Sequence, residues 1–254
     1  KAAMDISIED IVVETGRKVG YINGNYIDVE QYIVENTVCA SIEDPTRWSH
    51  HVNDQSIVIG WAGYDARTHF LPPEHFIGHV FRDAIIDSCN GGLLSGHGPD
   101  GKILVRVREE ESEWRLEHLL ITIQQLEATS LLDVCSAVSS TIQDAYNLLQ
   151  KRDSRWRSSW EQVELMINPN GPLLNGGSDG DNGQTGRKLA VDFYGPRIPI
   201  GGGALSGKHI SHIDRIGAYA ARDAAVRAVK SGPEECMVRL CYAPNVSTPL
   251  DISF

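Results

Sequence analysis

The stretch GDNGQTGRKLAVDFYGPRIPIGGGALSGK, residues 180 to 208, gathers glycines around Arg187, Lys188 and Lys208. Glycine lets a backbone approach an anion closely and reach positive φ, so glycines beside cations are typical of loops that bind phosphate. A pair of ordinary turns is the plainer alternative. Two such loops joined by one strand would bring the three cations together around one anion. A polyphosphate is the anion that needs so many cations.

The second half of this stretch, GGGALSGK at residues 201 to 208, ends like a P-loop but does not match one. The pattern G-x-x-x-x-G-K-[ST] requires serine or threonine after the lysine, and His209 stands there instead. No predicted strand runs directly into the loop. The segment therefore argues against a nucleoside triphosphatase of the P-loop type.

Composition limits the classes of partner. The 254 residues carry a formal net charge of −11. Because a nucleic-acid backbone requires a broad basic surface, we expect no nucleic-acid partner and a phosphate group that is bound only locally. No apolar run approaches the ~20 residues of a membrane span, and the first residues, KAAMDISIED, lack the apolar core of a signal peptide. We therefore expect no membrane partner and a cytoplasmic location.

Hydrophobic periodicity predicts strands that alternate unevenly with helices. The predicted strands are Ser56 to Trp61, Lys102 to Arg108, His118 to Gln124, Val163 to Ile167, Lys188 to Tyr194 and Met237 to Tyr242. The predicted helices are Pro73 to Cys89, Leu131 to Lys151 and Ile213 to Ser231, the last begun by Ser211 and Asp214 in capping-box spacing. The stretch Lys151 to Trp160 is interpreted as a polar connector. This order predicts an α+β fold with helices on one face of largely antiparallel sheets.

Acidic residues stand in turns next to several predicted strands. Residues 176 to 186, GGSDGDNGQTG, cannot hold regular structure, so they predict a loop that carries Asp179 and Asp181. Asp100 and Lys102 lie at the mouth of one strand, and Asp54 lies just before another. Each is individually explained as a turn residue. Together they favour a shared site, because carboxylates are the hard oxygen ligands that Mg²⁺ accepts beside phosphate oxygens.

The order of these motifs resembles the S-adenosylmethionine synthetase (methionine adenosyltransferase) family. GDNGQTGRK and GGGALSGK are similar to the family patterns GDxGxTGRK and GGGAxSGK, in the same order and at a similar separation. HIDRIGAYAAR, which begins at His212, resembles KVDRSAAYAAR. Further upstream, NDQSIVIGWA, GPDGKILVRV and ETGRKVG resemble GDQGLMFGYA, RPDAKxQVTV and CETxVKTG.

The resemblance implies a reaction and an architecture. The methionine sulfur attacks the ribose C5′ of ATP, and the tripolyphosphate that leaves is hydrolysed in the same site to phosphate and diphosphate. Mg²⁺ and K⁺ are the implied cofactors, and the implied assembly is a homodimer or a dimer of dimers with the site at the subunit interface. The implied fold has three similar β-α-β-type units in a pseudo-threefold arrangement, which we place at residues 1–45, 46–172 and 173–254.

The resemblance also assigns roles to single residues. The implied catalytic residues are Asp181, Arg187, Lys188 and Lys208. These four are also implied to bind ATP, together with Asp100, Lys102 and Ala204. The implied methionine-binding residues are Glu14, Asp181 and His212, and the implied metal ligands are Asp54 and Asp214. Plainer interpretations exist: Asp214 as a capping residue, Glu14 as a surface residue and Lys102 as a solvated side chain.

The sequence departs from the family pattern in ways that leave alternatives open. His212 stands where the family has a lysine near methionine, and Pro172 and Leu173 replace an Arg-Phe pair at the nucleotide. The family's N-terminal GHPDK motif does not occur in the printed sequence. One alternative is a non-catalytic or regulatory family member. The other is a polyphosphate-releasing adenosyltransferase with a different acceptor.

Overall fold

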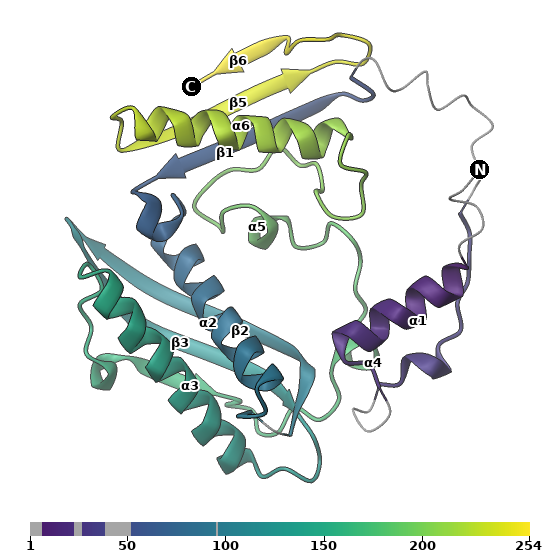
Figure 1. Cartoon of the computed structure of the whole chain (residues 1–254), viewed down its shortest axis with the longest axis vertical. Helices are drawn as coiled ribbons and strands as arrows, with labels where there is room; N and C mark the ends of the chain where they lie inside the picture. Colours follow the sequence, from purple (N-terminus) through teal and green to yellow (C-terminus); the bar gives the residue numbers. More distant parts are fainter. Residues whose placement is uncertain (1–6, 23–26, 39–51, 95) are drawn as a thin grey trace. The chain divides into compact units, whose positions relative to one another are not determined.

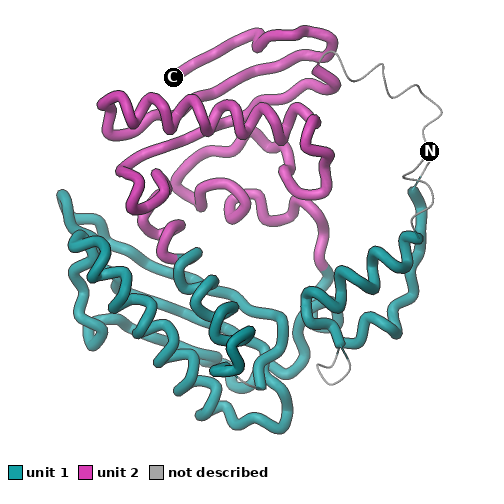
Figure 2. Tube along the Cα trace, in the orientation of Figure 1, with its two compact units in different colours: residues 1–40, 78–182 teal, residues 41–77, 183–254 magenta. Residues whose placement is uncertain are grey.

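The chain folds into two compact units in the computed structural model, which describes residues 7–22, 27–38, 52–94 and 96–254. Unit 1 contains residues 1–40 and 78–182, and unit 2 contains residues 41–77 and 183–254 (Figure 2). Both units combine helices with a small sheet (Figure 1), so the predicted α+β class is confirmed. The pseudo-threefold arrangement and the division into three units stay predictions.

The sheet of unit 1 is built on a long hairpin. Strands β2 (His97–Glu110) and β3 (Glu113–Gln125) pair in antiparallel register, and β4 (Glu164–Ile167) adds parallel to β3. Side chains alternate along β3, with Leu119 and Ile121 buried on one face. The sequence predicted all three strands, although β2 and β3 extend beyond the predicted bounds.

Two helices pack on this sheet in unit 1. The helix α2 (Pro73–Asn90) crosses from unit 2 into unit 1, and α3 (Leu131–Arg152) begins at Ser130, whose side chain accepts the Asp133 N–H. Figure 1 shows both helices along the hairpin, and the rings of Phe81 and Tyr146 contact each other with centroids 6.5 Å apart. Both predicted helices are confirmed.

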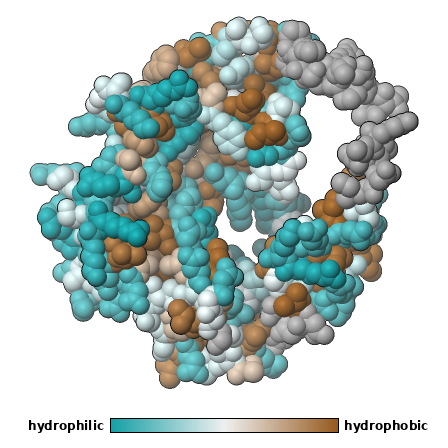
Figure 3. Space-filling model, viewed as in Figure 1, coloured by the Kyte–Doolittle hydropathy of each residue, from teal (hydrophilic) through white to brown (hydrophobic). Residues whose placement is uncertain are grey.

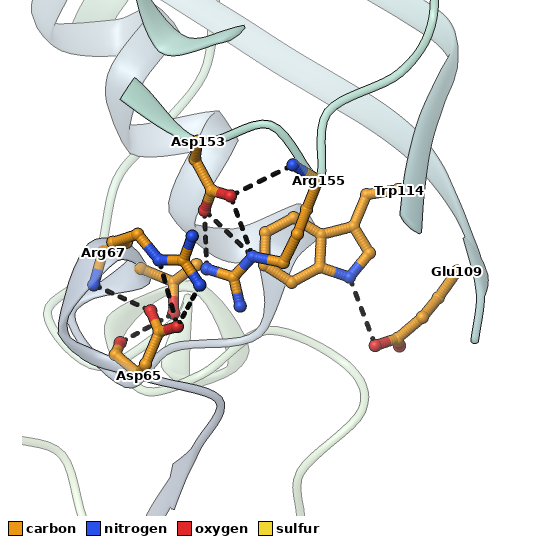
Figure 4. Close-up of polar contacts among 7 residues, drawn as sticks. Asp65, Arg67, Glu109, Trp114, Asp153 and Arg155 are labelled. Carbon is orange, nitrogen blue, oxygen red and sulfur yellow. Dashed lines mark hydrogen bonds and ion pairs between the residues drawn. The ribbon is translucent and has the colours of Figure 1, made fainter. Parts of the chain in front are cut away.

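The segment after α3 is more than a polar connector, which corrects the prediction for residues 151 to 160. Trp156 is buried and its ring meets that of Trp114 at 5.0 Å. Arg155 lies over the Trp114 ring at 4.1 Å and donates to the buried Asp153 at 2.9 Å (Figure 4). This pairing satisfies the charge of Asp153, so the segment closes one end of the core of unit 1. A 3₁₀ turn, Trp160–Gln162, leads from it into β4.

A helix that the sequence did not predict lies near the N-terminus in unit 1. The helix α1 (Ile8–Val19) begins at Ser7, whose hydroxyl accepts the Asp10 N–H at 3.1 Å, and ends at Gly20 in the left-handed region. A 3₁₀ turn, Val29–Gln31, follows it. The turn packs on α1, because Arg17 pairs with Glu30.

Unit 2 is a three-stranded antiparallel sheet with one helix on it. Strand β5 (Glu235–Tyr242) lies between β1 (Ser56–Gly63) and β6 (Asp251–Ser253), and α6 (Ile213–Lys230) covers the sheet. The core between them is made of small and branched side chains: Val58, Ala62, Ala218, Ala221, Ala225, Val229, Val238 and Leu240. Alanines let the helix approach the strand closely, and the predicted strands and helix are confirmed here.

The predicted strand from Lys188 to Tyr194 is wrong. Residues Leu189–Asp192 form one turn of helix, α5, closed by the bond from the Phe193 N–H to the Leu189 carbonyl. Leucine and alanine favour helix over strand, and this stretch pairs with none of the sheet strands described in unit 2. The predicted loop at residues 176 to 186 likewise holds one turn of helix, α4 (Gly177–Gly180), in unit 1. A further 3₁₀ turn, Ala66–Thr68, follows β1.

Within the described ranges, none of the helices combines the length and the apolar character that crossing a bilayer requires. On the face shown in Figure 3, hydrophobic residues are scattered among hydrophilic ones. Scattered exposed apolar side chains are normal for a folded domain.

Candidate active site

The polar centre of unit 2 is the carboxylate of Asp214, in the first turn of α6. Its side chain is only 10% exposed. One carboxylate oxygen accepts from the hydroxyl of Ser56, the first residue of β1, at 2.5 Å. The other accepts from the ammonium of Lys208, whose side chain keeps 31% of its surface exposed. Asp214 therefore anchors the end of the glycine-rich loop to the sheet.

The two glycine-rich segments of unit 2 lie against each other, as predicted. A Cβ placed on Gly186 would lie 2.9 Å from the Cβ of Ala204, and one placed on Gly207 would lie 2.6 Å from Cγ2 of Thr185. Only glycine permits so close an approach. Residues 183 to 188 and 201 to 208 thus form one double loop, which carries Arg187, Lys188, Ala204 and Lys208.

Arg187 and Lys188 are exposed in this double loop. Lys208, by contrast, is held by Asp214, and its backbone carbonyl accepts from Arg215 of α6 at 2.7 Å. One cation of the loop is therefore fixed in place by the helix, while the other two project from the surface of the double loop. Such an arrangement offers one anchored positive charge and two exposed positive charges on the same double loop, which suits the binding of an anion.

Asp214 stays ionised over a wide pH range. Burial raises the pKa of its carboxyl, but the hydrogen bonds from Lys208 and Ser56, together with nearby positive charge, lower it by more, so the pKa lies below its ordinary value. A carboxyl whose pKa is lower in the folded state adds stability above its unfolded pKa of about 3.9. That contribution is lost as the pH falls through the folded pKa.

A pH series on Asp214→Asn checks this. We expect the stability advantage of the wild type over this variant to be constant from pH 7 to about 5 and to shrink below pH 4. Thermal unfolding at each pH measures it. Asp223→Asn is the control, because the Asp223 side chain is 56% exposed and its pair with Arg227 is screened by solvent. Parallel curves for wild type and Asp214→Asn would contradict the role given to Asp214.

His212 has an unexpected place at the start of α6. It is the N-cap residue, and its ring Nδ1 accepts the Asp214 N–H at 3.2 Å. The predicted cap, Ser211, is wrong: its hydroxyl contacts the His209 ring at 2.7 Å instead. An imidazole nitrogen that accepts a hydrogen bond carries no proton, so Nε2 carries the N–H of the neutral ring. That Nε2 lies 4.0 Å from Oδ2 of Asp54.

The two predicted metal ligands differ in their fit to Mg²⁺. This ion takes one or two protein carboxylates together with phosphate oxygens and water. Asp54 fits, because its carboxylate side chain is 55% exposed and therefore accessible to an ion. Asp214 does not fit in this arrangement, because both of its oxygens accept hydrogen bonds from Ser56 and Lys208. Within the described ranges, histidine, cysteine and acidic side chains form no group of three suited to a metal ion.

A second set of predicted residues lies in unit 1. A cavity of about 160 Å³ opens beside β2, lined among others by Lys102, Thr122, Asn175, Gly180 and Asp181. Asp100 also borders it, and its Oδ2 accepts the Gly177 N–H at 2.9 Å. Asp100, Lys102 and Asp181 therefore border one cavity, and their role in binding ATP stays a prediction.

Glu14 is not among the residues that line this cavity. It lies on α1, 68% exposed, and pairs with Lys18 one turn later at 2.7 Å. The hydrogen bond from Lys18 lowers the pKa of its carboxyl. This geometry is that of a surface helix pair, and the methionine-binding role of Glu14 stays a prediction.

Two polar residues of these clusters were missed in the sequence. Ser56 begins a predicted strand directly after the acidic turn, and that position was the available signal. Gln124 is fully buried at the end of β3, in the run ITIQQ, and donates to the Leu174 carbonyl at 3.0 Å. A glutamine inside an otherwise apolar strand indicates a buried polar contact, because an unpaired buried amide is costly.

Two comparisons relate this geometry to known proteins. Residues 175–254 match the family model of the S-adenosylmethionine synthetase C-terminal domain. The fold is similar to a solved structure of an S-adenosylmethionine synthetase from Campylobacter jejuni, described as unusual, with a TM-score of 0.79 and 25% sequence identity. The similarity covers 96% of this chain and 63% of the Campylobacter jejuni chain.

The two findings agree with the residues of the site. The matched C-terminal domain contains the double loop, Asp214 and His212. The fold similarity extends over nearly all of both units. The chain is therefore similar to S-adenosylmethionine synthetases, in sequence over residues 175–254 and in fold over nearly all of its length.

Proposed function

We propose that this chain is a methionine adenosyltransferase. It forms S-adenosylmethionine from ATP and L-methionine and hydrolyses the released tripolyphosphate to phosphate and diphosphate. The observation that carries the proposal is the double loop of unit 2, in which the segment that carries Arg187 and Lys188 lies against the segment of Lys208, whose ammonium is anchored by the buried Asp214. A leaving group with several negative charges is the partner that such a set of cations suits.

The chemistry requires charge stabilisation more than proton transfer. A thioether sulfur is a neutral nucleophile, so its attack on C5′ needs no general base. The barrier lies in breaking the bond between C5′ and the oxygen of the polyphosphate, where negative charge collects. Cations fixed before the reaction stabilise that charge without reorganising, and Lys208, which Asp214 anchors, takes this role with Arg187 and Lys188 on the same double loop.

Asp214 has an indirect role in this proposal. It fixes the ammonium of Lys208 between the helix and the strand, so the donor needs no reorientation when the bond breaks. In the ATP-binding set, Lys102 and Asp181 contribute from unit 1, and Ala204 contributes its backbone in the double loop. Asp181, His212 and Glu14 form the proposed methionine-binding set.

The cofactors and partners belong to the proposal as well. Mg²⁺, when bound, supplies further positive charge to the phosphate oxygens, with Asp54 as the carboxylate that fits it. K⁺ follows from the family. We further propose a cytoplasmic homodimer or dimer of dimers with the site at the subunit interface. The net charge of −11 supports the absence of a nucleic-acid partner.

One observation favours a second candidate, an adenosyltransferase that releases polyphosphate but uses another acceptor. His212 stands where the family has a lysine, and it caps α6 through Nδ1. In that state the ring is neutral and offers one N–H in place of an ammonium. A neutral donor binds an amino-acid carboxylate more weakly than a cation does, which leaves room for a different acceptor.

A product assay separates these candidates. The purified chain is incubated with ATP, Mg²⁺ and K⁺, with and without methionine, and products are identified by mass spectrometry. We expect S-adenosylmethionine only when methionine is present. Release of phosphate at equal rates without methionine would favour the second candidate. If neither product forms, both catalytic proposals fail and a non-catalytic role in the family is left.

A further inference from the structure

The side chain of Gln124 joins β2 to the loop that carries Asp181. It is fully buried in unit 1, at 0% exposure. Its Nε2 donates to the Leu174 carbonyl at 3.0 Å, and its Oε1 accepts the Asp100 N–H at 3.4 Å. One amide thus contacts the backbone of both segments.

Asp100 completes this connection. Its Oδ2 accepts the N–H of Gly177 at 2.9 Å. The loop packs tightly onto both side chains, since a Cβ on Gly176 would lie 3.0 Å from the Cβ of Asp100 and 3.0 Å from the amide of Gln124. The segment from Leu174 to Gly177 is therefore held by two hydrogen bonds and by close packing.

The held segment leads directly to the cavity. The turn α4 begins at Gly177, and Asp181 ends it with its N–H bonded to the Gly177 carbonyl at 3.0 Å. Lys102, two residues from Asp100, lines the same cavity. Any movement of the Leu174 to Gly177 segment would move Asp181 relative to Lys102.

We propose that Gln124 and Asp100 are positioning residues, which hold the Asp181 loop in place rather than contact the nucleotide. The family resemblance makes Asp100 a nucleotide contact, whereas here one of its carboxylate oxygens binds the backbone of the loop. The inference deepens the proposed function, because it concerns the shape of the cavity that Lys102 and Asp181 share. Its physical basis is independent of the ligand.

Neighbouring glutamines supply a matched control. Gln124→Met keeps the size of the side chain and removes both hydrogen bonds. Gln125→Met makes the same change one residue later, at a side chain that is 1% exposed and donates to the Thr129 carbonyl at 2.8 Å. Asp100→Ala removes the contact to Gly177, and Asp100→Asn keeps an acceptor oxygen there.

Hydrogen exchange of the ligand-free full chain tests the positioning itself. In Gln124→Met and Asp100→Ala we expect exchange in peptides covering residues 174 to 181 to accelerate about tenfold, the effect of losing one net hydrogen bond. In Gln125→Met and Asp100→Asn it should stay within about twofold of the wild type. Wild-type exchange in both Gln124→Met and Asp100→Ala would overturn the proposal. Because Asp100 lies at the edge of the core, Asp100→Ala decides the question even if Gln124→Met does not fold.

Steady-state kinetics then test the consequence. We expect KM for ATP to rise about tenfold in Gln124→Met and Asp100→Ala, with little change in kcat, and to be restored in Asp100→Asn. A raised KM in Asp100→Ala with wild-type exchange would instead make Asp100 a direct nucleotide contact and overturn the proposal. A wild type that forms no S-adenosylmethionine, with the expected exchange pattern, would refute the proposed function and leave the positioning role intact.

Discussion

Lys208→Ala is expected to lower the rate of S-adenosylmethionine formation by about 100-fold to 1,000-fold, the usual effect of removing one preorganised donor to a developing charge. The ammonium is fixed by Asp214 before the substrate arrives, so no other cation of the double loop replaces it in position. We expect the loss in kcat rather than in KM, since the charge develops only as the bond breaks. Single-turnover measurement of product formation checks this.

The same substitution is also expected to lower the stability of the protein, although a lysine in a loop usually contributes little to stability. Without Lys208 the buried carboxylate of Asp214 keeps the hydrogen bond from Ser56 and has the His212 ring 3.9 Å away, and a buried group that loses a hydrogen-bond partner costs about 1–3 kcal/mol. Lys208→Arg keeps a cation for Asp214 and should recover part of the stability. Lys230→Ala is the control, because Lys230 ends α6 far along the helix from Asp214. Undiminished product formation by Lys208→Ala would remove the basis of the catalytic account.

Gly60→Ala is expected to destabilise unit 2 by about 3 kcal/mol or more, the upper range for overpacking a core. A Cβ at this position of β1 would lie 2.0 Å from the backbone carbonyl carbon of Ala221 and 2.2 Å from the Arg222 nitrogen. Backbone atoms cannot turn aside as a side chain does. The helix α6 would have to lift from the sheet, which would open the alanine-lined core. Urea unfolding of the purified protein measures the change.

Gly78→Ala is the matched control for this effect. Gly78 lies inside α2, and a Cβ there would have no neighbour within 4 Å. Alanine is the better helix former, so this substitution should leave stability unchanged or raise it by up to about 1 kcal/mol. If Gly60→Ala and Gly78→Ala had the same unfolding midpoint, the close packing of α6 on β1 would be wrong.

The sequence was most reliable for elements in which the apolar pattern and the capping residues indicate the same helix or strand. In α3, Ser130 caps the helix and Val138, Ile142 and Leu149 are buried at helical spacing, so pattern and packing give the same answer. The close approach of residues 183 to 188 to residues 201 to 208 was also predictable, because recurring glycines let two backbone segments approach each other closely. In both cases local chemistry decides the structure.

Where the prediction failed, local preference was weak or a distant partner decided. The helix α1 holds several β-branched residues and Gly16, which weaken its helical signal although Ser7 and Asp10 mark its start. Ser211 was the expected cap of α6 by residue type, but the ring of His212 takes that place. The bond from Ser56 to Asp214 joins residues 158 positions apart, and no local pattern encodes such a pairing.

The central claim is that the double loop serves adenosyl transfer with release of polyphosphate. The most direct measurement is the ratio of products formed by the wild-type protein from ATP and methionine with Mg²⁺ and K⁺. We predict S-adenosylmethionine, phosphate and diphosphate in equal amounts, with all three lost together in Lys208→Ala. Formation of phosphate without S-adenosylmethionine would contradict the claim. Undiminished amounts of the three products in Lys208→Ala would contradict it as well.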